Sequence, residues 1–224
     1  MKKIKIIAIT VLSLFSANSI FSQNINWKNL KDEEKHILSV NAGWEYSFVY
    51  GISYGYKLET KTPIIIESSY SFPSGETIFD DFKTKIGGQI NFYNIDNIQF
   101  NASIHGSYRK TENPLAVLQN FGCDINTVIG YYKPKWFLVA EIGFDKAIVT
   151  HFKHSNIYKE VYPNVKNGWY EPTTGGNFNF GIQTGYSFKR SDLTLRLGKV
   201  ITQDFKTSPL IPFYVQLGYN YKLD

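Results

Sequence analysis

Hydrophobic and polar residues alternate one by one along most of this 224-residue chain. In the stretch GGNFNFGIQTGYSFK, residues 175–189, apolar side chains stand at even positions and most polar ones at odd positions. Successive side chains of a β-strand point to opposite faces, so this period of two predicts a strand with one apolar face. The same alternation predicts ten strands, at residues 36–46, 51–58, 64–72, 82–93, 98–108, 121–132, 136–149, 178–188, 193–202 and 213–223.

The predicted connections alternate in length. The short ones are ETKTP, NIDN, KPK and KRSD, and the long ones are PSGETIFDD, RKTENPLAVLQN, residues 150–176 and QDFKTSPL. Short turns at one end and long loops at the other are typical of an all-β, transmembrane, antiparallel up-and-down β-barrel. The first connection, around residues 47–49, interrupts the alternation only weakly, which leaves nine or eight strands as alternatives. Ten strands would put both chain ends on the short-turn side, and we prefer that number.

Aromatic residues gather at the ends of the apolar strand faces. Those near the short turns are Tyr54, Tyr56, Phe92, Tyr131, Trp136, Tyr186, Phe188, Tyr219 and Tyr221. Those near the long loops are Trp44, Tyr46, Tyr70, Phe72, Phe82, Tyr108, Phe121, Phe178 and Phe213. Two aromatic girdles around an aliphatic band are typical of a lipid-facing surface. We therefore expect the apolar face to point outward into a membrane; a soluble lipocalin-like barrel, with the apolar face around a ligand, is the alternative.

The N-terminus has the order of a secretory signal peptide. Three lysines precede an apolar run at residues 6–15, and small residues follow up to Ser22. The run is shorter than the roughly 20 residues that a membrane-spanning helix needs, so we predict cleavage near Ser22 and export. The predicted division is a signal peptide at 1–22, a short periplasmic segment at 23–35 and the barrel at 36–224.

Charge and cysteine content exclude several classes of protein. The chain has 24 basic and 19 acidic residues, and without the three lysines of the signal peptide its net charge is only about +2. So small a charge argues against nucleic acid as a partner. Cys123 is the single cysteine, which excludes an internal disulfide and a cysteine metal site. We expect no cofactor and no metal.

The C-terminal stretch FYVQLGYNYKLD alternates from Phe213 to Tyr221. It resembles the terminal strand that the barrel-assembly machinery recognises in small bacterial outer-membrane β-barrel proteins, the porin-like and opacity-type group. It departs from that group because it ends in Leu223 and Asp224 rather than in an aromatic residue. The resemblance covers essentially the whole mature chain and is one of pattern. It implies location in the cell outer membrane, with outer-membrane lipid, lipopolysaccharide and the barrel-assembly machinery as partners.

The polar strand faces carry charges that would lie inside the barrel. Four of them fall at similar depth on four successive strands, and an acid and an arginine two strands apart lie deeper. An unpaired charge is costly in a low-dielectric interior, so we expect ion pairs that fill a narrow lumen. An ion-selective constriction is the alternative. The residues of this predicted lumen cluster are Lys85, His105, Asp124, Asp145, Glu141 and Arg196.

Three residues stand out on the apolar faces. Lys146 and Lys199 fall on positions that should face lipid, so we expect each to lie at a bulge or at the rim. Cys123 shares its face with Ile125 and Ile129 and should point to lipid near the outer rim.

Histidines, acids and aromatic residues crowd into the predicted loop 150–176. Exposed Tyr and Trp are frequent binding anchors, so this loop is a candidate contact for an extracellular ligand. A cap over the barrel mouth is the alternative. The candidate contact residues are Phe152, Tyr158, Tyr162, Trp169 and Tyr170.

An outer-membrane hydrolase is the alternative to a non-enzymatic role. Asp80 and Asp81 with His151 and His154 are faintly similar to the acids and histidines of omptin proteases, but no Asp stands two residues before either His. Lipid A deacylases have one residue between their His and Ser, whereas His154 and Ser155 are adjacent. A metal site at the two histidines lacks a third ligand. We predict no catalytic residues, and either a structural, surface-interaction role or a narrow small-solute porin.

Overall fold

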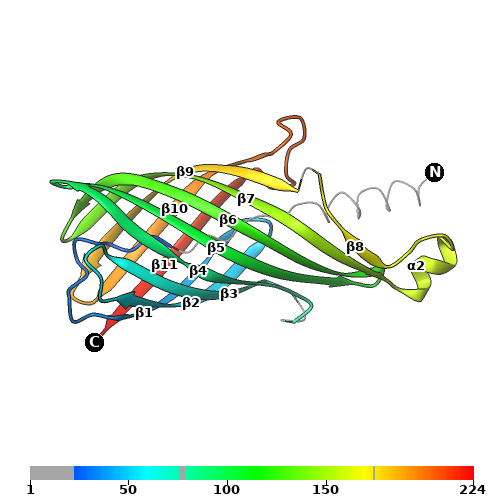
Figure 1. The fold of residues 1–224 in the computed structure, drawn as a ribbon, viewed down its shortest axis with the longest axis horizontal. Coiled ribbons are helices and arrows are strands. Elements are labelled where there is room, and N and C mark those ends of the chain that lie inside the picture. The colour runs from blue at the N-terminus through cyan, green and yellow to red at the C-terminus, as the bar shows by residue number, and fades with distance from the viewer. Residues whose placement is uncertain (1–22, 76–78, 174) are drawn as a thin grey trace.

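The computed structural model describes residues 23–75, 79–173 and 175–224, so the predicted signal peptide lies outside the described part. Its strands form one antiparallel sheet that closes because β6 pairs with β7 and β1 pairs with β11 (Figure 1). Ten strands complete the barrel, and the eleventh, β8, is attached to β7 alone. The prediction of a ten-stranded up-and-down barrel is confirmed.

The barrel strands differ greatly in length. Their bounds are β1 His36–Trp44, β2 Phe48–Leu58, β3 Ile64–Pro73, β4 Asp81–Ile95, β5 Ile98–Asn113, β6 Ala116–Lys133, β7 Trp136–His154, β9 Gly176–Phe188, β10 Ser191–Thr202 and β11 Phe213–Leu223. Between β7 and β9 lie helix α2, Asn156–Val161, and strand β8, Gly168–Tyr170. No helix in the described ranges has the length and apolar character needed to span a bilayer.

The apolar faces point outward, as the alternation predicted. Ile86 is 68% exposed and Leu217 is 58% exposed, whereas Gln89 and Arg196 on the polar faces are buried. So continuous an apolar belt is unfavourable in water and favourable in lipid. A closed barrel also leaves no strand edge with unpaired backbone groups in the hydrocarbon. The fold is therefore that of a membrane-spanning, outer-membrane β-barrel.

An aromatic girdle surrounds the loop end of this belt. Ring contacts run without a break from Trp44 on β1 to Phe121 on β6, with centroid distances of 5.0–5.9 Å. We call this set of outward-facing rings the upper girdle; its members on these strands are Trp44, Phe48, Tyr50, Tyr70, Phe72, Phe82, Tyr108 and Phe121. Such girdles lie at the membrane–water interface, and in outer-membrane barrels the long loops face out of the cell. The loop end is therefore the extracellular end.

The prediction of a long loop at RKTENPLAVLQN, residues 109–120, is wrong. Strands β5 and β6 continue through it and pair as far as Asn113 and Ala116, which leaves a turn of two residues. Strand β7 continues with them to His154 after a bulge near Ile148. The upper parts of β5, β6 and β7, together with α2 and β8, project beyond the other strands (Figure 1). We call this part, residues 109–120 and 150–170, the extension.

Candidate functional site

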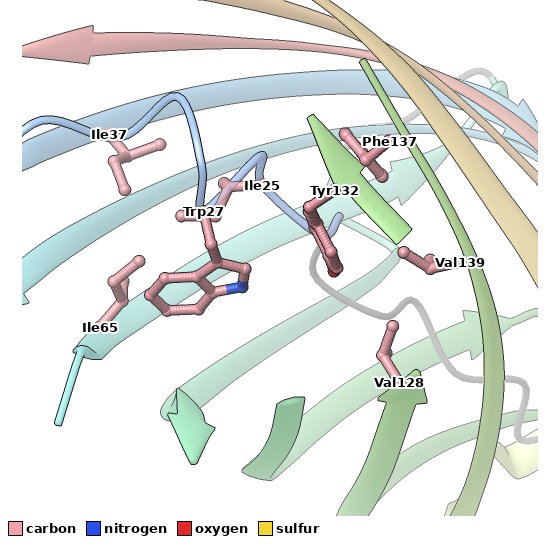
Figure 2. Close-up of a cluster of buried hydrophobic side chains, with 8 residues drawn as sticks. All are labelled: Ile25, Trp27, Ile37, Ile65, Val128, Tyr132, Phe137 and Val139. Carbon is pink, nitrogen blue, oxygen red and sulfur yellow. The ribbon is translucent and has the colours of Figure 1, made fainter. Parts of the chain in front are cut away.

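The short-turn half of the lumen is filled by the chain's own N-terminal segment. Ile25 and Trp27 lie inside the barrel, only 2% and 8% exposed. Figure 2 shows them among apolar side chains that point inward from the wall, and together these residues form one apolar cluster. We call residues 23–27 the N-terminal plug. The wall residues of the cluster are Ile37, Ile65, Val128, Tyr132, Phe137 and Val139.

Hydrogen bonds hold the polar residues of the plug. The Asn24 side chain donates to the Tyr132 hydroxyl at 2.7 Å, and its backbone exchanges two bonds of 3.2 Å with the Gln183 side chain. The Asn26 side chain donates to the Ser187 hydroxyl and to the backbone carbonyl of Lys133, both at 2.8 Å. The plug is thus joined to several strands of the wall, and it closes this half of the lumen.

The sequence carried a signal for the plug that the alternation analysis did not use. Ile65, Phe137 and Val139 are apolar although they occupy inward-facing positions, and all lie close to the short turns. An apolar inner wall needs an apolar occupant, and Ile25 and Trp27 alternate in the segment that precedes the barrel. The segment 23–35 was predicted only as periplasmic chain; the structure places its first residues within the lumen.

Higher in the lumen, charged side chains form a connected cluster. Lys85 Nζ lies 2.7 Å from Asp124 Oδ2, and His105 Nδ1 lies 3.1 Å from Asp124 Oδ1. His105 Nε2 lies 2.6 Å from Glu67 Oε1, so the imidazole bridges two carboxylates. Asp145 stands directly across from Asp124 in the β6–β7 pairing. The structure thus brings the four predicted residues together and adds Glu67, which the sequence analysis left out of the cluster.

Glu141 and Arg196 meet between this cluster and the plug. Arg196 Nε lies 2.7 Å from Glu141 Oε1, and the Arg196 guanidinium also lies 4.4 Å from the centre of the Tyr214 ring. The Tyr214 hydroxyl donates to Glu141 Oε1 at 2.5 Å. Tyr214 was not predicted here, although it stands at an inward position of β11. Its ring fits because Gly181 and Gly198 leave its hydroxyl room; a methyl group at either position would collide with it.

A further ion pair lies at the mouth. Arg109 Nη2 lies 3.0 Å from Asp81 Oδ2, and Arg109 Cζ lies 4.0 Å from the centre of the Tyr46 ring. Tyr46 was expected on the lipid-facing girdle, and that expectation is wrong. The turn of residues 45–47 breaks the alternation, so the ring packs on an inward-facing guanidinium instead.

The predicted contact residues of the extension divide between its two faces. Phe152, Tyr158, Tyr162 and Tyr170 belong to one row of rings that passes through His154, with centroid distances of 5.0–6.2 Å. Trp169 lies on the other face, 6.0 Å from the ring of Phe121. The row runs from β8 over β7 to α2, in the part of the chain that projects beyond the other barrel strands (Figure 1).

The groups weighed for hydrolysis lie apart. Asp81 is bonded by Arg109 on β5, whereas the His154 backbone donates to Asn167 Oδ1 at 2.9 Å on the far side of β6. Ser155 Oγ accepts from the Tyr158 backbone N–H and so caps α2. Catalysis by these groups would need them within hydrogen-bond reach. Within the described ranges, no group of three His, Cys, Asp or Glu side chains is placed to hold a metal ion.

Comparisons with known proteins add little. No family model and no curated protein matches the sequence. One similar solved structure is described as "KdgM porin in complex with disordered oligogalacturonate"; it has 7% identity and a TM-score of 0.45, and the alignment covers 84% of this chain and 99% of that one. A second, from work described as "Unveiling the Mechanism Behind the in-meso Crystallization of Membrane Proteins", has 8% identity and a TM-score of 0.38, covering 85% and 84%.

Proposed function

We propose that this outer-membrane barrel is non-enzymatic and closed, and that it serves to hold the extension at the cell surface for contact with extracellular partners. The observation that carries the proposal is the N-terminal plug. A wall with apolar inward positions at Ile65 and Phe137 fits a lumen that is kept shut, because water-filled channels are lined by polar side chains. The ion pairs above the plug close the rest of the lumen, between the plug and the mouth.

The extension supports the second half of the proposal. Trp169 is 58% exposed and Tyr170 is 47% exposed, although both belong to a strand that is paired with β7. Rigid, exposed aromatic side chains cover much contact area at a small loss of conformational entropy on binding. A barrel that only needed to cross the membrane would gain nothing from three strands that continue past it.

A narrow small-solute porin is the second candidate. A polar cavity of about 20 Å³, room for about one water molecule, lies between the plug and the ion pairs. Its polar lining favours this candidate, since a wet gap could join others if the plug moved. The lining residues include Asn24, Glu67, Gln89, Asn126 and Gln183.

Conductance separates the two candidates. The mature chain, purified and inserted into a planar lipid bilayer, should give no stable single-channel steps. Removal of residues 23–27 should add at most brief, small events, because the ion pairs of the other half remain. Large and stable steps from the unmodified chain would overturn the closed barrel and establish the porin.

Replacement of residues 155–170 by a short turn tests the role of the extension. The barrel pairings of β7 with β6 and β9 do not involve α2 or β8, so the variant should fold and keep a different gel mobility when unboiled. A variant that no longer folds would show that these residues stabilise the barrel rather than serve contact at the surface.

A further inference from the structure

Two lysines stand on the lipid-facing surface of the barrel. Below the extension, Lys146 and Lys199 are the charged side chains on the outward positions of the loop half, within the strands that the structure describes. Neither forms an ion pair with a carboxylate of the described residues, in contrast to Lys110, whose Nζ lies 2.7 Å from Glu112 on the extension. The predicted bulge lies near Ile148 on β7, not at either lysine.

Both lysines lie at the height of the upper girdle. Lys199 on β10 pairs with Phe213, the first residue of β11, whose ring is half exposed. Lys146 on β7 pairs with Cys123, two residues from Phe121. On these two strands a lysine therefore takes the place that aromatic rings occupy on the neighbouring strands. The girdle marks the membrane–water interface, so both ammonium groups reach the layer of lipid headgroups.

The strand between them completes the surface. Phe178 and Phe180 of β9 lie outward, and the ring of Phe178 is 4.7 Å from that of Phe144 on β7. Lys199 pairs directly with Phe180. The surface thus has two cations flanking a floor of aromatic rings, and it is continuous with the lipid-facing belt.

We propose that Lys146 and Lys199 bind the phosphate groups of anionic lipids in the outer leaflet, while Phe178 and Phe180 contact the acyl chains of the same lipids. The argument rests on charge and continuity. A lysine without a carboxylate partner on a lipid-facing surface gains from a headgroup anion, and at the interface it pays little for leaving water. Phe180 lies directly beside Lys199. Phe178 lies two residues nearer the short turns than Gly176, the partner of Lys146, so each cation has an aromatic ring next to it on the lipid-facing surface.

Lipid enrichment around the barrel tests the proposal. The mature chain is refolded in phosphatidylcholine vesicles that contain a small fraction of bisphosphorylated lipid A, extracted in a mild detergent, and analysed by native mass spectrometry for lipid that stays bound. The double variant Lys146→Gln/Lys199→Gln should retain roughly thirtyfold less lipid A, on the order expected for two interfacial lysines. Dephosphorylated lipid A should bind parent and variant equally weakly.

Matched variants keep the result specific. Lys153→Gln/Lys166→Gln removes the same charge from the extension and should leave lipid A retention unchanged. Lys146→Arg/Lys199→Arg keeps the charge and should retain lipid A like the parent, which also covers the case in which the glutamine variant fails to fold. Equal retention by the parent and the glutamine variant would overturn the proposal, as would an equal loss in the extension control.

Discussion

The two halves of the lumen are closed by different means. In the short-turn half, a separate segment of chain, the N-terminal plug, fills the space with apolar contacts and hydrogen bonds. The wall there has a buried ion pair, Lys222 with Asp192, and the Asp192 carboxylate also accepts from the Asn26 backbone N–H at 3.4 Å. In the loop half, the wall closes itself with buried ion pairs, such as Lys85 with Asp124 and Arg196 with Glu141. The first kind of closure can be undone by withdrawing one segment. The second cannot be undone without exposing or separating buried charges.

The two halves of the lumen therefore differ in the free energy that is needed to open them. A plug held mainly by neutral hydrogen bonds, each worth roughly 1 kcal/mol net, and by a small apolar cluster can detach while the barrel stays intact, because the Lys222–Asp192 pair belongs to the wall and remains. Separation of a buried ion pair leaves a charge in a low-dielectric site, which costs several kcal/mol. A single event therefore does not open the whole lumen, and the loop half is the stronger barrier.

The largest expected effect is the loss of Arg196. Arg196→Ala leaves Glu141 buried without its cation, and we expect the free energy of unfolding to fall by roughly 3 to 5 kcal/mol. Urea titration of the barrel in vesicles, read as the fraction that keeps its folded gel mobility, measures this loss.

The double variant is the control for that result. Glu141→Ala/Arg196→Ala removes both charges, so it should be more stable than Arg196→Ala although it lacks one more side chain. It should still give no stable single-channel steps, because the N-terminal plug and the Lys85–Asp124 pair remain. If the free energy of unfolding of the double variant falls by as much as the falls in Arg196→Ala and Glu141→Ala added together, the two side chains do not act as a pair that closes this half.

Trp27→Ala should have the next largest effect, and it should be local. The indole packs in the cluster with Ile37 and Ile65, and its loss should weaken docking of the plug by about 3 kcal/mol. Hydrogen exchange should therefore rise at residues 23–27 while the strands stay protected.

A conservative change separates packing from hydrogen bonding at this position. The Trp27 indole N–H has no hydrogen-bond partner within the described residues, so Trp27→Phe should keep the plug docked. Increased exchange throughout the barrel in Trp27→Ala would mean that the plug is part of the same cooperative unit as the wall, and the contrast between the halves would fail.

A smaller fall in the free energy of unfolding is expected when a methyl group is added next to Tyr214 in the lumen. Gly181→Ala places a methyl group against the Tyr214 hydroxyl and should cost roughly 1 to 3 kcal/mol by displacing the ring that supports Glu141. Gly106→Ala is the matched control, because its nearest neighbour would be the Ile86 carbonyl at 3.9 Å. Equal stability of the two variants in urea would show that Tyr214 has room to move.

Alternation along the chain was sufficient to predict the ten barrel strands where they cross the membrane, nearly all of their faces, and the inward position of Lys85, Asp124, Glu141 and Arg196. Parity fixes which side of a strand a residue occupies, and a closed barrel then leaves an inward charge few partners. The position of the plug was harder to foresee. Docking of residues 23–27 depends on contacts with strands more than 100 positions away, such as Tyr132 and Gln183.

The extension was missed for a different reason. The stretch RKTENPLAVLQN contains charged and turn-forming residues, which favour a loop when no lipid-facing alternation is visible. Above the membrane a strand no longer needs an apolar outward face, so the alternation ends although the pairing of β5 with β6 continues to Asn113. The sequence pattern therefore marks the membrane boundary rather than the end of the strands.

The smallest expected effect concerns Cys123, and it tests the parity on which the loop half depends. Cys123 precedes Asp124 on β6, so if Asp124 points to the lumen and reaches Lys85, the thiol points to lipid and is half-buried among outward side chains. A membrane-impermeant maleimide should then label the native barrel slowly and the urea-unfolded chain fully.

Ser208→Cys in a Cys123→Ser background supplies the fast control, because Ser208 is exposed in the loop between β10 and β11. Rapid labelling of native Cys123 would mean that this strand is shifted by one residue, since a thiol that points to lipid is shielded from a membrane-impermeant reagent. Asp124 would then face lipid, its pairing with Lys85 would be impossible, and closure of the loop half by buried ion pairs would have to be abandoned.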